Sequence, residues 1–212
     1  MKTALVIGAS GGIGSALCAR LEGLGVQVTS LSRSVDGFDL TQPEQALQML
    51  DDLPDPFDLV LVVSGALEVN GAEPEKTIRA VSAQAMMDQF ALNAVGPALV
   101  LSRGHRLLPR DRRSVFGVLS ARVGSIGDNR IGGWISYRAA KAAVNQIVRT
   151  SAIELARTHK QAICVSLHPG TVKTAFTHLT SDIFSYKSLI LLCLGCQKAL
   201  HGLFSPAIVS EC

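Results

Sequence analysis

The chain has 212 residues, which suits one compact α/β domain with a buried core better than two small independent domains. Hydrophobic residues make up 48% of the chain and charged residues 17%, a composition that excludes the disordered class of proteins. The net charge of +3 comes from scattered basic residues, so the sequence lacks the continuous basic face that nucleic-acid binding requires.

Short aliphatic runs alternate with longer segments of helical periodicity, which is the pattern of a parallel sheet covered by helices. Strands are predicted at residues 4–7, 26–31, 59–63, 114–119 and 163–167, with a weak edge strand through Phe38 and Leu40. Helices are predicted at residues 12–24, 43–53, 83–108 and 134–159. Right-handed crossovers then give a doubly wound Rossmann fold with helices on both faces, in which ligands bind beyond the carboxyl ends of the strands.

The first predicted strand leads directly into a glycine-rich turn that opens a helix. Gly8 permits the tight turn, Gly12 lets the backbone approach a pyrophosphate, and Gly14 lets the helix pack closely on the strand. An ordinary glycine-rich turn is the alternative, but the coincidence of strand, turn and helix favours nucleotide binding. The predicted cofactor contacts of this turn are Gly8, Ser10, Gly11, Gly12, Ile13 and Gly14.

The spacing of this turn resembles that of the short-chain dehydrogenase/reductase family, and the segment after the second strand indicates which nucleotide binds. An acidic residue there would accept hydrogen bonds from the adenosine ribose and repel a 2′-phosphate. This chain has Arg33, whose planar guanidinium can bind that phosphate. NADP(H) is therefore the predicted cofactor, with a solvated surface charge as the alternative role of Arg33.

The resemblance implies three further contacts on the adenosine side of the cofactor. Asp39 and Leu40 are similar to the family's pair that contacts the adenine amino group by side chain and following backbone; a turn-forming Asp39 is the alternative. After the third long strand the family shows Asn-Asn-Ala-Gly, whereas this chain has Val-Val-Ser-Gly, ending at Gly65. Gly65 keeps the close backbone approach to the adenine ribose, but the asparagine amide is missing.

Tyr137 and Lys141 lie four residues apart, which puts both on one face of the last predicted helix. A free tyrosine keeps its proton until pH ~10, so a neighbouring cation is needed to lower the pKa of the phenol toward the working range. Alone, this spacing is a common coincidence on helix surfaces. After the glycine turn it resembles the family's catalytic signature, which implies that Tyr137 gives a proton to a carbonyl oxygen during hydride transfer. The resemblance also implies that Lys141 binds the nicotinamide ribose.

Two further polar positions are candidates for the site. Asn93 lies inside a predicted helix, where asparagine is a poor helix former, and it matches the family's asparagine whose backbone kink holds a water in the proton relay to the lysine. A polar residue on a half-exposed face is the alternative. The family commonly places the second of two serines against the substrate oxygen, but the second position here is Ala121. Ser120 is the preferred replacement and Ser125 the second candidate.

The last predicted strand is followed by a segment that resembles the family's nicotinamide-bordering PGxVxT sequence. It implies cofactor contacts from Pro169, Gly170 and Val172, with a plain Pro-Gly turn as the alternative. The run over residues 120–134 is similar to the carbonyl reductase and C-factor-like branch, and the likeness covers residues 1–177. Residues 1–177 are therefore expected to form the Rossmann domain. Residues 178–212 form an atypical or truncated tail in which no edge strand is predicted.

The odd number of cysteines, five, favours a reducing intracellular environment. Cys193 and Cys196 have CxxC spacing, but no second ligand pair follows them, so no metal site is predicted. The apolar run before Gly8 and the run at residues 188–195 are too short for a signal peptide or a membrane span. We expect a soluble cytoplasmic protein without nucleic-acid or membrane partners. The family resemblance implies a homodimer or homotetramer through the two long helices.

Two functions from different classes follow from the sequence. The first is NADP(H)-dependent reduction of a small carbonyl compound, or oxidation of the corresponding alcohol, with Tyr137 and Lys141 at the reacting atoms. The second is a catalytically weak or inactive nucleotide-binding protein with an interaction or regulatory role, which Ala121 and the unusual tail favour. Turnover of NADPH with carbonyl compounds distinguishes the two.

Overall fold

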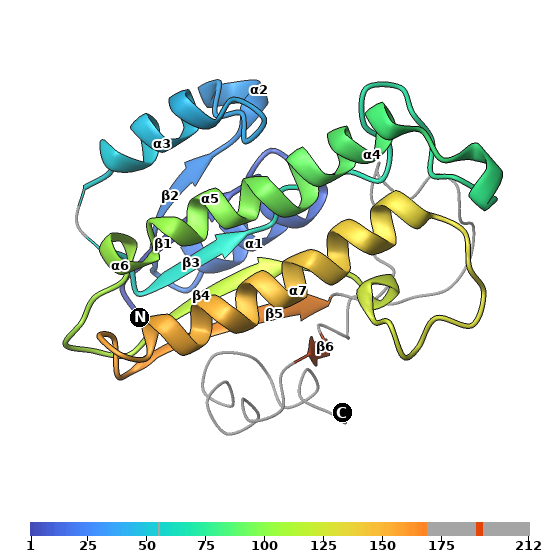
Figure 1. Ribbon diagram of the computed structural model, residues 1–212. Coiled ribbons are helices and arrows are strands. Elements are labelled where there is room, and N and C mark those ends of the chain that lie inside the picture. Colours follow the sequence, from blue (N-terminus) through green and yellow to red (C-terminus); the bar gives the residue numbers. More distant parts are fainter. Residues whose placement is uncertain (55, 169–189, 193–212) are drawn as a thin grey trace.

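The computed structural model describes residues 1–54, 56–168 and 190–192 of the chain. A twisted sheet lies between helices on its two faces (Figure 1), with strand order β2-β1-β3-β4-β5-β6. The strands are β1 (Thr3–Ile7), β2 (Gln27–Leu31), β3 (Leu59–Val62), β4 (Ser114–Leu119), β5 (Ala162–His168) and β6 (Ile190–Leu192). All pairings among β1 to β5 are parallel, which confirms the predicted doubly wound α/β fold.

The helices cover the sheet unequally. Helix α1 (Gly12–Glu22) packs on one face, whereas α3 (Pro43–Asp51), α5 (Gly96–Ser102) and α7 (Ile135–Leu155) pack on the other. The shorter elements are α2 (Arg33–Asp36), α4 (Ala83–Phe90), α6 (Gly104–Leu107), the 3-10 helices η1 (Ile78–Ala80) and η3 (Arg122–Gly124), and the π-helix η2 (Ala91–Val95). Among the described helices, none combines the length and the apolar character that crossing a membrane would need.

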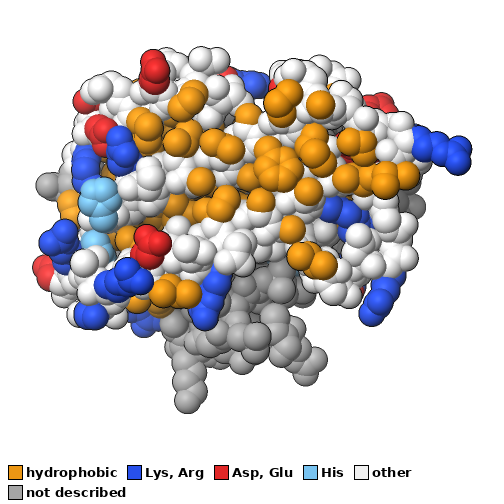
Figure 2. All heavy atoms as spheres, viewed as in Figure 1, with side chains coloured by type: hydrophobic (Ala, Val, Ile, Leu, Met, Phe, Trp, Pro, Cys, Tyr) orange, Lys and Arg blue, Asp and Glu red, His pale blue; other side chains and the backbone are white. Residues whose placement is uncertain are grey.

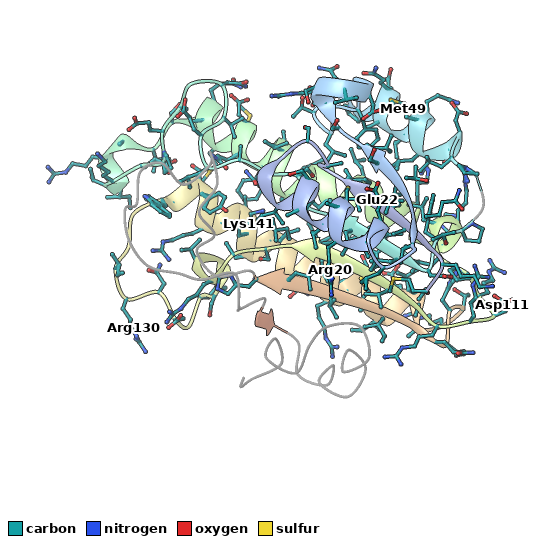
Figure 3. All side chains as sticks on the ribbon, turned by 180° about the vertical axis from the view of Figure 1, so that it is seen from behind. Arg20, Glu22, Met49, Asp111, Arg130 and Lys141 are labelled. Carbon is teal, nitrogen blue, oxygen red and sulfur yellow. The ribbon has the colours of Figure 1, made fainter. Side chains whose placement is uncertain are left out.

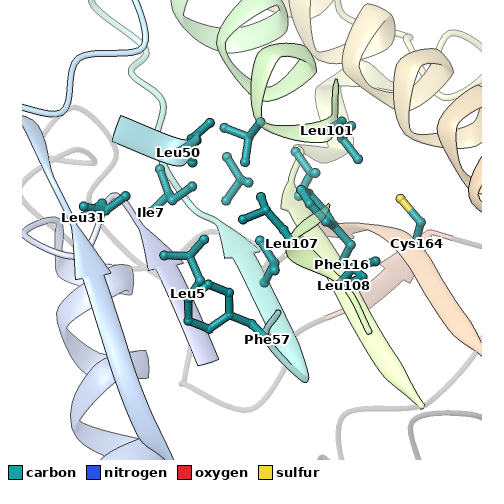
Figure 4. Close-up of a cluster of buried hydrophobic side chains, with 14 of the residues drawn as sticks. Leu5, Ile7, Leu31, Leu50, Phe57, Leu101, Leu107, Leu108, Phe116 and Cys164 are labelled. Atoms are coloured by element: carbon teal, nitrogen blue, oxygen red, sulfur yellow. The ribbon is translucent and has the colours of Figure 1, made fainter. Parts of the chain in front are cut away.

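The core consists of two apolar layers, one on each face of the sheet. Strand β3 is buried throughout, as its continuous aliphatic sequence predicts for a strand between two helical layers. The larger layer, drawn in Figure 4, surrounds Phe116 of β4, whose side chain is completely buried. Burial of each such large side chain contributes about 1.5–3 kcal/mol, so these layers fix the positions of the strand ends that carry the site.

The predicted single helix over residues 83–108 is wrong in one informative respect. The structure divides it into α4, the π-helix η2, α5 and α6. Pro97 lies at the start of α5 and has no backbone N–H, so it cannot donate to the carbonyl of Asn93 four residues earlier. The wider π turn at residues 91–95 accommodates this missing bond. The π turn thus contains the asparagine that the sequence singles out.

Two expectations about sheet edges are wrong. Phe38 and Leu40 are buried but form no strand; they follow α2 and a left-handed Gly37 with φ +69°, and the Phe38 N–H donates to the Ser32 carbonyl at 3.1 Å. Their apolar character reflects a loop that packs into the core. The other edge carries a short strand where the sequence predicts none, because β6 pairs antiparallel with the end of β5.

Candidate active site

The residues singled out by the sequence gather beyond the carboxyl ends of the parallel strands. The glycine turn follows β1, Arg33 follows β2, Gly65 lies after β3, and Ser120 follows β4. Figure 3 shows Lys141 of α7 near this end of the sheet and Asp111 at the opposite end. The fold therefore brings together positions that are more than a hundred residues apart in sequence, such as Gly8 and Lys141.

The glycine turn fits a dinucleotide phosphate. Gly8 has φ +91°, and a β-carbon there would lie 2.6 Å from the backbone nitrogen of Ser64. A β-carbon at Gly14 would lie 2.8 Å from Ala9 Cα, so the helix can approach the strand only with glycine. Helix α1 starts at Gly12 after Gly11, which offers no capping side chain, and its first N–H groups are left for an anion. The buried Ser64 hydroxyl also has no hydrogen-bond partner among the described residues.

The end of β2 lies beside this turn, since the backbone N–H of Gly8 donates to the Leu31 carbonyl at 2.8 Å. The backbone N–H and the hydroxyl of Ser32 donate to Asp36 Oδ2 at 2.8 and 3.0 Å, which fixes the short helix α2. Arg33 begins α2, is exposed, and forms no ion pair within the part of the chain that the structure describes. It is therefore available to a 2′-phosphate at the neighbouring glycine turn.

Asp39 takes the turn-forming role that the sequence offered as its alternative. Its Oδ1 accepts hydrogen bonds from the Thr41 N–H at 2.9 Å and the Thr41 hydroxyl at 2.7 Å. Its Oδ2 has no such bond in the described chain and can still accept from an adenine amino group. Leu40 is buried against the position of Gly96, where a β-carbon would lie 2.8 Å from Leu40 Cβ.

Tyr137 and Lys141 form a buried pair on α7. The exposed fractions are 7% and 2%, and the Lys141 Nζ lies 5.7 Å from the centroid of the Tyr137 ring. The ammonium donates to the Leu119 carbonyl at the end of β4, 3.1 Å away. Gly124 lets η3 lie against α7, because a β-carbon there would be 2.9 Å from Lys141 Cβ.

The pKa values of this pair differ from the sequence-based expectation. Burial raises the pKa of Tyr137 to about 12 and lowers the pKa of Lys141 to about 8. The pKa of the tyrosine is thus shifted upward, opposite to the lowering that a neighbouring lysine was expected to cause. Desolvation disfavours the charged form of each group, and it is the cause of both shifts.

Asn93 clamps the loop after β3 to the π-helix. Its side chain is completely buried, which excludes the alternative of a half-exposed helix face. Its Nδ2 donates to the Ala66 carbonyl at 2.8 Å, and its Oδ1 accepts from the Ala66 N–H at 3.2 Å. Gln89 extends the clamp: it accepts from Asn93 Nδ2 at 2.7 Å and donates to the Leu67 carbonyl at 2.6 Å.

Gly65 lies next to both the Asn93 side chain and the Lys141 ammonium. A β-carbon there would lie 2.7 Å from Asn93 Oδ1 and 3.3 Å from Lys141 Nζ, and the backbone has φ +150°. These distances place Asn93 and Lys141 beside the same backbone position. Glycine at this position therefore keeps the end of β3 close to both side chains.

We expect the substitution Gly65→Ala to lower the free energy of unfolding by about 2–3 kcal/mol, because it adds backbone strain and displaces the Asn93 amide. Urea unfolding followed by circular dichroism measures this change. Gly127→Ala is the matched control, since a β-carbon at Gly127 meets nothing within 4 Å. The control should change stability by less than about 0.5 kcal/mol. Equal stabilities of the two variants would contradict the close approach at Gly65.

The two serine candidates differ in their surroundings. Ser120 is 3% exposed, and its hydroxyl donates to Asn145 Oδ1 on α7 at 2.7 Å. Ser125 is half-buried on the loop after η3, and its hydroxyl makes no hydrogen bond to the described residues. Ala121, between them, has no hydroxyl. The geometry thus leaves the Ser125 hydroxyl more available to a substrate oxygen than the Ser120 hydroxyl.

Pro169, Gly170 and Val172 lie outside the described residues, as do Cys193 and Cys196.

Three polar residues of the site have no counterpart among the sequence-based expectations. Gln89 holds Asn93, Asn145 holds Ser120, and Arg138 donates to the Gly133 carbonyl at 2.9 Å. Gln89 lies four residues before Asn93, a helical spacing that places both on one face and could have indicated the pair. The contact between Asn145 and Ser120 joins two elements that are 25 positions apart, for which the sequence contains no local signal. The contact between Arg138 and Gly133 is local, but it depends on the left-handed backbone before α7.

These features define a Rossmann-type α/β protein with a glycine-rich turn and a buried Tyr–Lys pair beyond the carboxyl ends of its parallel strands. The short chain dehydrogenase family model matches residues 35–182 of the chain. The chain belongs to this family.

Similar proteins agree with this assignment. A 1-hydroxy-2-glutathionyl-2-methyl-3-butene dehydrogenase of Rhodococcus sp. (strain AD45) is 28% identical over 192 residues, which are 84% of this chain and 80% of that protein. The C-signal protein of Myxococcus xanthus is 36% identical over 92 residues, 42% of this chain and 52% of that protein. A short-chain dehydrogenase/reductase of Burkholderia multivorans with bound NADP is 28% identical, with a TM-score of 0.71 over 86% of this chain and 84% of that one.

Proposed function

We propose that the protein is an NADP(H)-dependent oxidoreductase that reduces a small carbonyl compound. The observation that carries the proposal is the buried Tyr137–Lys141 pair, which lies beside Asn93 and Gly65 at the same sheet edge as the glycine turn. Family membership and the related structure with bound NADP support it. The substrate is a small aldehyde or ketone, and the reverse reaction oxidises the alcohol.

The chemistry follows from the protonation states of the pair. Bound NADPH supplies a hydride for the carbonyl carbon. Tyr137, whose pKa burial raises to about 12, is fully protonated at neutral pH and gives its proton to the carbonyl oxygen. The ammonium of Lys141, close to the ring, stabilises the phenolate that this transfer produces. Ser125 or Ser120 contacts the substrate oxygen, and Asn93 holds the neighbouring loop and the water of the proton relay.

The experiment that tests this function is an assay of purified protein with NADPH and a panel of aldehydes and ketones. We expect carbonyl-dependent oxidation of NADPH, measured as the loss of nicotinamide absorbance. Tight binding of NADPH without oxidation by any carbonyl would overturn the proposed activity. That outcome favours the second function, a nucleotide-binding protein with an interaction role. Two observations support this second function. The Ser120 hydroxyl already donates a hydrogen bond to Asn145, and Ala121 has no hydroxyl to offer a substrate oxygen.

The preference for NADP(H) rests on Arg33. We expect Arg33→Ala to weaken NADPH binding about 10- to 100-fold, because it removes charge-assisted hydrogen bonds to the 2′-phosphate worth about 1.5–3 kcal/mol. NADH binding should stay unchanged, and both affinities are measured by fluorescence titration. Arg113→Ala is the control, since Arg113 is exposed before β4 at the opposite end of the sheet. Equal affinities of the unmodified protein for NADPH and NADH would refute this preference.

We further propose that copies of the chain associate through the face formed by α4, α5 and α7. Figure 2 shows hydrophobic side chains in a band across these helices. Met87 of α4, Val95 of η2 and Ile153 of α7 are 57%, 47% and 50% exposed, which is high for large apolar residues. This face corresponds to the two long segments that the family resemblance implied for a dimer or tetramer.

A further inference from the structure

The catalytic helix begins with an unusual backbone. Gly132, Gly133 and Trp134 precede α7 with φ values of +72°, +66° and +53°, three left-handed residues in succession. Trp134 is a non-glycine residue, for which this conformation costs about 1–2 kcal/mol. It is also the N-cap of α7, and its indole provides no capping hydrogen bond. Tyr137 lies in the first turn of this helix, so the same turn sets the position of the phenol.

Glu75, on the loop between β3 and η1, provides the missing cap. Its backbone carbonyl accepts a hydrogen bond from the Trp134 N–H at 2.5 Å. Its Oε2 accepts from the Ser136 N–H at 3.2 Å, and its Oε1 accepts from the Ser136 hydroxyl. Glu75 and Ser136 are 7% and 1% exposed, so this contact is buried although the two residues lie 61 positions apart. A carboxylate at a helix N-terminus satisfies free N–H groups and interacts favourably with the helix dipole.

The carboxyl group of Glu75 stays ionised at neutral pH. Burial alone would raise its pKa, but hydrogen bonds, chiefly from the Ser136 hydroxyl, outweigh burial and hold the pKa below its usual value. The buried charge is therefore compensated by the start of the helix. These hydrogen bonds hold the loop that carries Glu75 against the start of α7 in a single arrangement.

The residues that Glu75 holds lie directly against the catalytic tyrosine. Ser136 precedes Tyr137 in the chain, and the Trp134 ring contacts the Tyr137 ring edge-to-face, with 6.4 Å between centroids and an interplanar angle of 73°. Arg138 fixes the other side of the turn through the carbonyls of Gly133 and Gly132 at 2.9 and 3.2 Å. The contacts of Glu75 thus reach Tyr137 by two routes, the helix backbone and the indole ring.

We propose that Glu75 is a positioning residue, which sets the orientation of the Tyr137 phenol toward Lys141 and the substrate by capping α7 and holding Trp134. The kinetic part of this inference rests on the proposed carbonyl reduction, whereas the structural part does not. Glu75 needs no contact with substrate or nucleotide for this role. Removing its carboxylate is therefore expected to change turnover more than the affinity for either.

The test compares Glu75→Gln with Glu73→Gln, an exposed glutamate two residues away on the same loop. Glu75→Gln should lower kcat about 10- to 100-fold, because small misplacements of a catalytic group cost that much. KM and the Kd for NADPH should stay within about threefold of the unmodified protein. Trp134 is the single tryptophan of the chain, so its fluorescence reports the cap without any substrate. Its emission should shift in Glu75→Gln and stay unchanged in Glu73→Gln.

Unchanged emission and unchanged kcat in folded Glu75→Gln would overturn the positioning role, even if the variant were less stable. Shifted emission in Glu75→Gln, with no turnover by the unmodified protein, would support the cap while contradicting the proposed reaction. If Glu75→Gln does not fold, Ser136→Ala removes a single donor to the carboxylate and takes its place. That variant should shift the Trp134 emission and lower kcat about threefold to tenfold. An unchanged kcat and emission in folded Ser136→Ala would overturn the proposal.

Discussion

Tyr137→Phe is expected to lower kcat for carbonyl reduction about 10²- to 10⁴-fold, the usual contribution of a general acid. The variant loses only the hydroxyl, and the phenyl ring can occupy the same buried space beside Trp134. The phenol makes no hydrogen bond within the described chain, so its removal leaves no buried partner unsatisfied. Stability should therefore change little, and the loss of activity should come from chemistry alone.

The measurement combines NADPH oxidation kinetics with a fluorescence titration of NADPH. The Kd of the variant should match that of the unmodified protein, because the phosphate turn and Arg33 lie on other elements. Thermal unfolding of both proteins confirms that they are equally folded. A variant that keeps more than about a tenth of the unmodified kcat would remove Tyr137 from the proton-donor role.

Lys141→Met is expected to have opposite effects on activity and stability. The ammonium is buried and donates to a single acceptor among the described residues, the Leu119 carbonyl, and none of the described salt bridges includes it. Its pKa falls from 10.5 to about 8 on burial, which corresponds to about 3 kcal/mol of lost stability at neutral pH. Methionine keeps the apolar stem and removes the charge. We expect a gain of about 1–3 kcal/mol in the free energy of unfolding and the loss of most activity.

The stability cost of the buried Lys141 ammonium should depend on pH. The cost of the buried ammonium is fully present below about pH 8 and disappears as pH rises through 10.5, where the unfolded chain also loses its proton. The gain in stability of Lys141→Met over the unmodified protein should therefore be largest at neutral pH. It should decrease as pH rises from about 8 to 10.5. Urea unfolding at neutral pH and at about pH 10 measures it. A variant less stable than the unmodified protein at neutral pH would show that the ammonium stabilises the fold.

Much of the fold could be predicted because its signals are local. Uninterrupted aliphatic runs identify strands that are buried on both faces, and the predicted strand at residues 114–119 coincides with β4. The glycine turn and the spacing of Tyr137 and Lys141 are equally local, and the structure places them at one end of the sheet. Their shared location follows from parallel topology, in which all strands end at the same edge.

The remaining features depend on contacts between distant segments or on competition between neighbouring groups. The π-helix at Asn93 requires the effect of Pro97 to be weighed against a strongly helical pattern. The cap of α7 comes from Glu75, and no rule of spacing connects residues 61 positions apart. The hydrogen bond from Ser120 to Asn145 likewise depends on the packing of α7 against the end of β4, which the sequence does not show locally.

The order of the strands has a consequence for biosynthesis. β1 lies between β2 and β3, and β4 and β5 then extend the sheet one position at a time. Each strand from β3 onward can therefore pair with an edge that already exists when it leaves the ribosome, without insertion between formed strands. The half that carries the glycine turn is synthesised first, whereas α7 and its tyrosine come later. A nascent chain can thus form its glycine turn well before it forms the buried Tyr137–Lys141 pair.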